Sequence, residues 1–117
     1  MHEVSLMEQT LDVAIRAAKQ EGANKIERLK MRIGTMSGVV PDALEFAFEA
    51  TTQGTIAEGA TFEIESIPVV CYCPSCQQDF QPPDFIYECP NCGRISTEAR
   101  SGKEIELATL ELSGFNS

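Results

Sequence analysis

The sequence predicts an α+β protein in which a small three-stranded sheet with two helices carries an inserted four-cysteine module. The main observation is periodicity: apolar residues recur every three or four positions in two segments and every second position in three others, which are the periods of helices and strands. In addition, every cysteine and four of the six prolines lie within residues 71–95, so this segment cannot be regular throughout. We therefore expect one domain from residues 1–70 and 96–117, with the module of residues 71–95 leaving it from two adjacent strands.

The first helix is expected over residues 4–18. Its apolar residues lie at three- and four-residue steps along one helix face: Val4, Met7, Leu11, Ala14, Ile15 and Ala18. Ser5 and Glu8 have the spacing of a capping box, and Gly22 suits the end of the helix. A helix that begins so close to the first residue holds the N-terminus against folded structure.

The second helix is expected to begin at Pro41, because proline suits the first helical position. Four residues at helical spacing mark its buried face: Leu44, Ala47, Phe48 and Thr51. Phe46 lies off this stripe. Three strands are expected over residues 26–33, 61–70 and 104–112, where apolar residues alternate with polar ones. Each strand therefore has one buried face.

The composition disfavours two classes of partner. The 117 residues include 18 acidic and nine basic side chains, for a formal net charge of -9 and a pI near 4.5. Such a surface repels phosphate backbones and anionic lipids, so we expect no nucleic acid and no membrane as a partner. The first residues do not have the pattern of a signal peptide, and no stretch approaches the roughly 18 apolar residues of a membrane span. We expect a cytoplasmic protein, in which thiols stay reduced.

The cysteines have the spacing of a zinc site. Cys73 and Cys76 form one Cys-x-x-Cys pair, and Cys89 and Cys92 form a second, with twelve residues between the two pairs. Two cysteines three apart in a tight turn can direct both sulfurs at one ion, and two such turns complete a tetrahedral Zn(II) site. Four thiolates leave no open position, so we expect a structural zinc in a zinc-ribbon-like module. Redox dithiols or iron–sulfur ligands are the alternative, and Cys71 is expected to be a strand residue with an ordinary thiol.

The only histidine of the chain is residue 2. The α-amine of Met1, the nearby backbone nitrogens and the His2 imidazole all lie within one short segment. Nitrogen donors set in a plane suit Ni(II) or Cu(II). Taken alone, a histidine near a chain end is more often a solvent-exposed residue without a role. With only one imidazole, any nitrogen-rich metal site in this chain has to be built at His2.

Several features occur together along the chain. Met1-His2-Glu3 opens directly into a helix, and residues 34–41 read Gly-Thr-x-Ser-Gly-Val-x-Pro before the second helix. Leu44, Phe46 and Phe48 follow, and the two Cys-x-x-Cys pairs come late in the sequence. This combination resembles the hydrogenase maturation nickel-insertion family, the small nickel metallochaperones that serve NiFe hydrogenase. The resemblance covers essentially the whole chain, and its specific parts are the opening tripeptide and the four-cysteine module.

The resemblance implies a nickel carrier without catalysis of its own, with residues 1–70 and 96–117 as a nickel-binding α/β domain. It implies that Ni(II) is bound at the N-terminus through His2 with nearby nitrogens, including the Met1 amine, and that Glu3 supports binding or partner contact. It implies a structural Zn(II) on the four paired cysteines. The implied partners are a nickel-binding maturation GTPase and the hydrogenase large subunit, with urease accessory proteins for some family members, and a homodimer is compatible with it. Some relatives carry histidines beside the cysteine pairs, and this chain has none.

Two other functions are compatible with the same residues. A zinc-ribbon adaptor would dock a basic partner on its acidic surface, with His2 incidental, and its binding would weaken with salt. An enzyme that uses redox dithiols would have cysteines that react readily with thiol reagents. The thiols of a zinc site would instead become reactive only after chelation.

Overall fold

The computed structural model describes residues 2–82, 86–96 and 98–115. The chain forms two compact units. Unit 1 contains Met1–Arg32, Val39–Glu65 and Glu106–Ser117, and unit 2 contains Ile33–Gly38 and Ser66–Ile105. Unit 2 therefore extends beyond the expected module of residues 71–95 at both ends, and it takes in the last two residues of the first strand and the turn after them.

Unit 1 has two helices, α1 (Glu3–Gln20) and α2 (Pro41–Thr51). Both follow the predicted apolar stripes, since the buried residues of α1 include Met7, Leu11, Ala14 and Ala18, and those of α2 are Leu44, Ala47 and Phe48. Helix α1 ends before Gly22, which has a φ of 77°. The capping box expected at Ser5 is wrong: α1 begins earlier, with His2 at the N-cap and no capping side chain, so Ser5 lies inside the helix.

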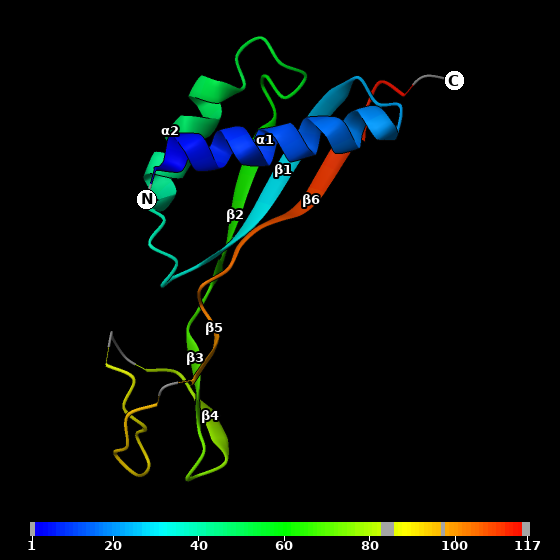
Figure 1. Ribbon diagram of the computed structural model, residues 1–117. Helices are drawn as coiled ribbons and strands as arrows, with labels where there is room; N and C mark the ends of the chain where they lie inside the picture. The colour runs from blue at the N-terminus through cyan, green and yellow to red at the C-terminus, as the bar shows by residue number, and fades with distance from the viewer. Residues whose placement is uncertain (1, 83–85, 97, 116–117) are drawn as a thin grey trace. The chain divides into compact units, whose positions relative to one another are not determined.

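The sheet of unit 1 has the strand order β2 (Thr61–Ile67), β1 (Lys25–Gly34), β6 (Ile105–Ser113). Helices α1 and α2 lie on one face of it, as Figure 1 shows. Phe48 of α2 stacks on Phe62 of β2 with ring centroids 4.7 Å apart. Because β1 is the central strand, β2 and β6 are not neighbours, and the expectation that the cysteine module leaves from two adjacent strands is wrong.

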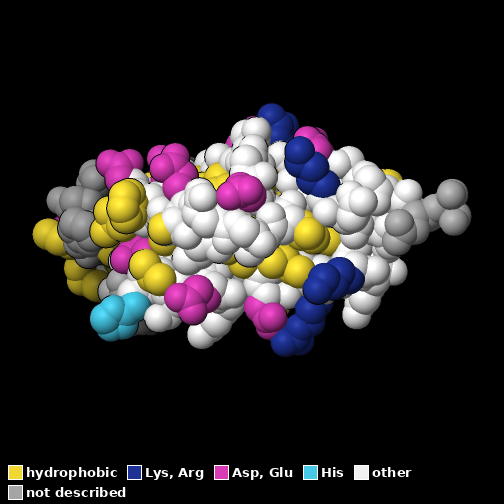
Figure 2. Space-filling model, turned by 90° about the horizontal axis from the view of Figure 1, so that it is seen from above, with side chains coloured by type: hydrophobic (Ala, Val, Ile, Leu, Met, Phe, Trp, Pro, Cys, Tyr) yellow, Lys and Arg dark blue, Asp and Glu magenta, His cyan; other side chains and the backbone are white. Residues whose placement is uncertain are grey.

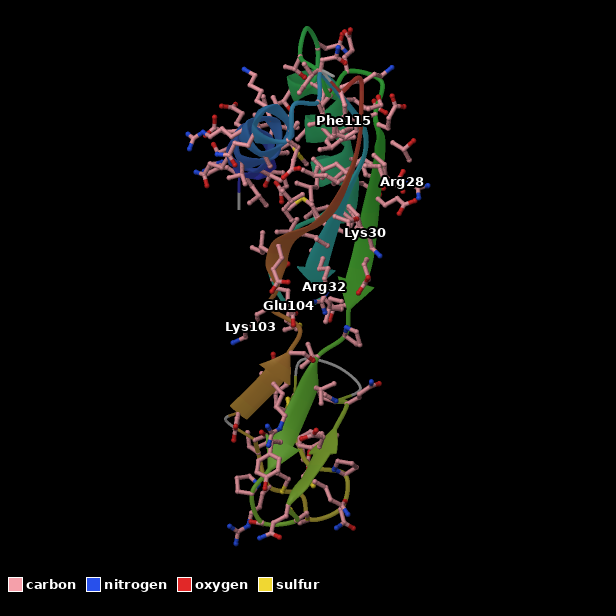
Figure 3. All side chains as sticks on the ribbon, turned by 90° about the vertical axis from the view of Figure 1, so that its right-hand side faces the viewer. Arg28, Lys30, Arg32, Lys103, Glu104 and Phe115 are labelled. Atoms are coloured by element: carbon pink, nitrogen blue, oxygen red, sulfur yellow. The ribbon has the colours of Figure 1, made fainter. Side chains whose placement is uncertain are left out.

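The other face of this sheet carries charged side chains. Arg28, Lys30 and Arg32 succeed one another along β1 (Figure 3), and they alternate with the buried residues of the same strand. Four glutamates on the flanking strands pair with them: Glu63, Glu65, Glu106 and Glu111. These exposed pairs are individually weak, but together they neutralise most of the acidic charge on this face.

Unit 2 has a second sheet in the order β4 (Gln78–Phe80), β3 (Val70–Cys73), β5 (Glu98–Ser101), with both pairings antiparallel. The single strand expected over residues 61–70 is therefore two strands, β2 and β3. The break falls at Pro68, which has no N–H to donate to a ladder. Strands β4 and β5 lie outside the strands that apolar alternation predicts, because both are short and polar.

Residues 33–38 belong to unit 2 because their backbone is bonded there. Thr35 N donates to Ile67 O at 2.9 Å, and Met36 N donates to Gly102 O at 2.8 Å. The backbone segments at Gly34 and Gly102 approach so closely that a Cβ on Gly34 would lie 2.1 Å from the carbonyl carbon of Gly102. Glycine is therefore required at position 34.

None of the helices in the described part of the chain is both long and apolar enough to span a membrane.

Candidate metal sites

The four paired cysteines come together in unit 2. Cys73 ends β3, and Cys76 lies in the turn that leads into β4. Cys89 and Cys92 lie in a second turn, which is closed by bonds from Gly93 N to Cys89 O and from Cys89 N to Arg94 O, both at 2.8 Å. Cys73 and Cys89 are buried, Cys76 is half-buried and Cys92 is exposed.

The sulfur atoms have the spacing of a tetrahedral site. All four lie within 4.8 Å of one another. The Cys73 and Cys92 sulfurs are 3.5 Å apart, and those of Cys76 and Cys89 are 3.9 Å apart. Zn–S bonds of about 2.3 Å in a tetrahedron place sulfurs about 3.8 Å apart. The cluster therefore fits one tetrahedral ion with thiolate ligands, and its sulfur spacing is compatible with Zn(II).

The surroundings of the second pair favour thiolate at one cysteine and oppose it at the other. The backbone N–H of Cys92, assisted by that of Asn91, bonds to the Cys89 sulfur and lowers the pKa of Cys89 to about 7. The N–H of Arg94 lowers the pKa of Cys92, but the sulfurs of Cys73 and its neighbours outweigh it and raise that pKa to about 11. Thiols this close do not all ionise unaided, and a divalent cation among them removes the repulsion.

The first pair is shaped by an unusual backbone. Gln77, directly after Cys76, has a φ of 53°, in the left-handed region that most residues avoid. Gly93 occupies the matching position after Cys92, with a φ of 77°. The side-chain N–H of Asn91 reaches across from the second turn and donates to the Cys76 sulfur at 3.3 Å. Both turns therefore have the same chain reversal after the second cysteine, and a side-chain bond links them.

Cys71 lies outside this cluster. It is fully buried in β3, where it pairs with Phe80 of β4 and Ala99 of β5. Burial raises the pKa of its thiol. Its placement in a strand, away from the four clustered sulfurs, agrees with the role expected from the sequence.

The predicted nickel-binding residues lie at the start of α1 in unit 1. His2 is exposed and has an extended backbone, with φ -89° and ψ 96°. Glu3 Oε2 accepts a hydrogen bond from the backbone N of Val40 at 3.1 Å, and this bond is the main cause of the lowered pKa of the Glu3 carboxyl. Val40 is the N-cap of α2, so Glu3 ties the beginnings of the two helices together. Met1, the third predicted residue, lies outside the described residues.

A surface hollow of about 340 Å³ adjoins His2. It is lined by His2 and Glu3 together with apolar side chains from both helices: Val4, Ala43 and Phe46. In Figure 2, which looks down on the molecule from above, the histidine (cyan) lies near hydrophobic side chains. A metal ion at His2 would be accessible to a second protein resting on the hollow.

The sequence pointed to the candidate metal-binding residues but missed the groups that contact them. Asn91 lies between the second pair of cysteines, so its place in the motif could have suggested a bond to sulfur. Val40 had no such signal, because it contributes only a backbone N–H and is 37 residues from Glu3. The strained backbone of Gln77 was also missed, because a glutamine has no bias towards a positive φ.

Comparison with known proteins identifies the family. Residues 1–112 match the family model described as "HypA: Hydrogenase/urease nickel incorporation, metallochaperone, hypA". The hydrogenase maturation factor HypA of Picosynechococcus sp. is 54% identical over 112 residues, covering 96% of this chain and 99% of that protein. The HypA of Roseiflexus sp. is 42% identical over 112 residues, covering 95% of this chain and 91% of its own.

Comparison with solved structures indicates the same family. The solution structure of the Ni metallochaperone HypA from Helicobacter pylori superposes with a TM-score of 0.70 and 27% sequence identity. The superposition covers 97% of this chain and 99% of that one. The match therefore includes both the helical unit with His2 and the unit with the four cysteines. This chain belongs to the HypA family of hydrogenase/urease nickel-incorporation metallochaperones.

Proposed function

We propose that this protein binds Ni(II) through the Met1 amine, the His2 imidazole and adjacent backbone nitrogens, and that it delivers the ion during maturation of NiFe hydrogenase. The observation that carries this proposal is His2 itself: the only imidazole of a nickel-metallochaperone chain is exposed, at the first turn of a helix. The N–H groups in the first turn of a helix have no intrahelical partner. Backbone nitrogens near His2 are therefore free to serve as ligands once they lose their protons.

The position of the site suits transfer rather than storage. His2 is exposed and adjoins an open hollow, so a partner can approach the ion and replace its ligands one by one. Binding requires a neutral imidazole, so acidification should release nickel. Glu3 supports the site in two ways: its carboxylate is held by Val40, and its negative charge lies beside His2. The proposed recipients and co-workers are the maturation GTPase and the hydrogenase large subunit, and urease accessory proteins where that enzyme is also served.

We assign a structural Zn(II) to Cys73, Cys76, Cys89 and Cys92. Four thiolates close the coordination sphere, so the ion has no position for a substrate. Unit 2 has few buried apolar side chains outside the cysteines themselves, and a bound metal would supply folding free energy that its core lacks. The proposed site of action is the cytoplasm, where thiols stay reduced and can bind the ion.

Metal analysis of the purified protein, with and without added nickel, tests both assignments. We expect one zinc per chain as purified, and one additional nickel per chain after incubation with nickel and removal of the excess. Zinc alone, with no nickel retained at micromolar concentration, would contradict the nickel site and favour a zinc-ribbon adaptor. Cysteines that react with thiol reagents before any chelation would contradict the zinc site.

A further inference from the structure

The outward side of α2 has an exposed aromatic residue that the fold does not use. Phe46 is 72% exposed, whereas its neighbours Ala47 and Phe48 are buried. The core is therefore complete without it. Phe46 also lines the hollow beside His2, where Val4 of α1 is 49% exposed. One exposed apolar residue is ordinary, but a phenylalanine that forms the edge of an apolar hollow is typical of a contact surface.

The acidic side chains around Phe46 also form no ion pairs within the part of the chain that the structure describes. Asp42, Glu45 and Glu49 are exposed on α2, and none of them has an ion-pair partner within residues 2–82, 86–96 and 98–115. The glutamates on the sheet of the same unit do have such partners on β1. No basic residue lies in the last turn of α2, so Glu49 faces the negative end of the helix dipole uncompensated. Asp42 lies in the first turn of α2, where a negative charge is favourable, whereas the charge of Glu49 is unfavourable near the end of the helix. A cationic surface outside the chain would compensate these charges.

We propose that Phe46 and the carboxylates around it, Asp42, Glu45 and Glu49, form a docking surface for a basic protein that exchanges nickel with the N-terminus. The partner surface that fits is an apolar recess, which receives Phe46, surrounded by lysine and arginine side chains. A second copy of this chain does not fit, because two such surfaces would set like charges against each other. The inference rests on the proposed nickel site, since the hollow that Phe46 lines begins at His2.

In a docked complex, Phe46 and the carboxylates should affect different rates of binding. Phe46 enters an apolar recess and loses contact with water, so it should act mainly on the dissociation rate, as buried aromatic anchors do. The carboxylates remain at the rim and should act mainly on the association rate and on its dependence on salt. A partner held on this surface lies against the hollow at His2, where ligands of the partner can replace those of this chain.

The test measures binding kinetics of the full, zinc-loaded protein to the purified maturation GTPase, the partner named in the proposed function. Phe46→Ala should weaken binding at least about tenfold, mostly through faster dissociation. Glu45→Gln with Glu49→Gln should slow association several-fold and flatten its salt dependence. Two matched controls should bind as the wild type does: Phe115→Ala, an exposed phenylalanine elsewhere in unit 1, and Glu21→Gln, an exposed acid at the end of α1.

Unchanged binding by Phe46→Ala, equal losses in the two controls, or no binding by the wild type would each overturn the docking surface. Thermal unfolding checks the fold, and an exposed residue such as Phe46 should leave the melting temperature unchanged. Nickel titration is run in parallel on wild type and Phe46→Ala, which should bind nickel equally. A wild type that binds the GTPase through Phe46 yet takes up no nickel would contradict the proposed function while leaving the docking surface in place.

Discussion

Glu3 and Val40 are joined by a hydrogen bond of 3.1 Å, in which the backbone N of Val40 donates to the Glu3 carboxylate. The acceptor follows the predicted nickel ligand directly, and the donor is the N-cap of α2. The start of α1 is thus held in place by a bond to a segment 37 residues away in the sequence. A site at the end of a chain needs such a constraint, because unanchored termini are poorly ordered.

Two substitutions separate the bond from the charge of Glu3. Glu3→Gln keeps an oxygen that can accept from Val40 N, whereas Glu3→Ala removes the acceptor. If Glu3 acts mainly by holding the start of α1 in place, Glu3→Ala should lower nickel affinity several-fold, and Glu3→Gln should lower it less, because it keeps the acceptor. Isothermal titration with nickel measures both. Equal losses in the two variants would mean that the charge matters and the bond does not.

The charged face of the sheet should make stability depend on pH. Lys30 donates to Glu65 at 2.9 Å and, with help from Arg32, lowers the pKa of the Glu65 carboxyl. The pKa of this group is lower in the folded than in the unfolded chain. Its contribution is therefore present above the ordinary carboxyl pKa of about 4.3 and is lost as the pH falls through the lower folded value.

Glu65→Gln should accordingly be less stable than the wild type at pH 7, with a difference that shrinks in acid. Urea unfolding at several pH values measures this. In the double variant with Lys30→Gln, the cost of losing Glu65 should be smaller than in the wild type, since the nearer of its two cationic partners is gone. A Glu65→Gln deficit that stays constant down to strongly acidic pH would show that the pairing with Lys30 does not stabilise the fold.

The four-cysteine assignment predicts which thiol substitutions release the metal. Cys76→Ser should lose zinc and unfold unit 2, while the helices of unit 1 keep their circular dichroism, because unit 1 has its own core. Cys71→Ala is the matched control: it empties a buried site at a cost on the order of 1 kcal/mol, yet it should keep one zinc. Metal analysis measures the zinc content of both variants, and circular dichroism measures how much folded structure each variant retains. Full zinc content in Cys76→Ser would contradict the assignment.

The strained turn after Cys76 predicts a stabilising substitution. Gln77 has a positive φ of 53°, a conformation that glycine adopts without steric cost. Gln77→Gly should therefore stabilise unit 2 by about 0.5–1 kcal/mol, measured as a higher chelator concentration at half loss of zinc. Gly93→Ala, at the matching position, should destabilise by about 1 kcal/mol through conformation alone, since its Cβ would meet only Glu88 Oε1 at 3.7 Å. A less stable Gln77→Gly would contradict this.

The sequence was sufficient wherever a single short-range pattern decides the structure. The periods of Met7, Leu11 and Ala14 in α1, and of Leu29, Met31 and Ile33 in β1, predicted these elements because burial of one face decides each of them. The predicted nickel-insertion family, with its non-catalytic role, is confirmed by the match over residues 1–112. The α+β fold with its four-cysteine cluster is confirmed as well.

What the sequence could not supply depends on partners far apart in the chain. The bond between Glu3 and Val40, and the close approach of Gly34 to Gly102, follow from the tertiary fold and leave no local pattern. The same holds for the position of β1 between β2 and β6. Alternation of apolar and polar residues predicts a strand, but it does not predict which strands pair. The roles of Met1, His2 and Glu3 in nickel binding stay predictions, as do the zinc ligands.

Nickel titration of the wild type against His2→Ala tests the central claim most directly. The wild type should bind one nickel per chain at its N-terminus, and His2→Ala should bind it at least about tenfold more weakly, with zinc content unchanged in both. Gln9→Ala, an exposed α1 position, should behave as the wild type does. Equal nickel stoichiometry and affinity in wild type and His2→Ala would contradict the account.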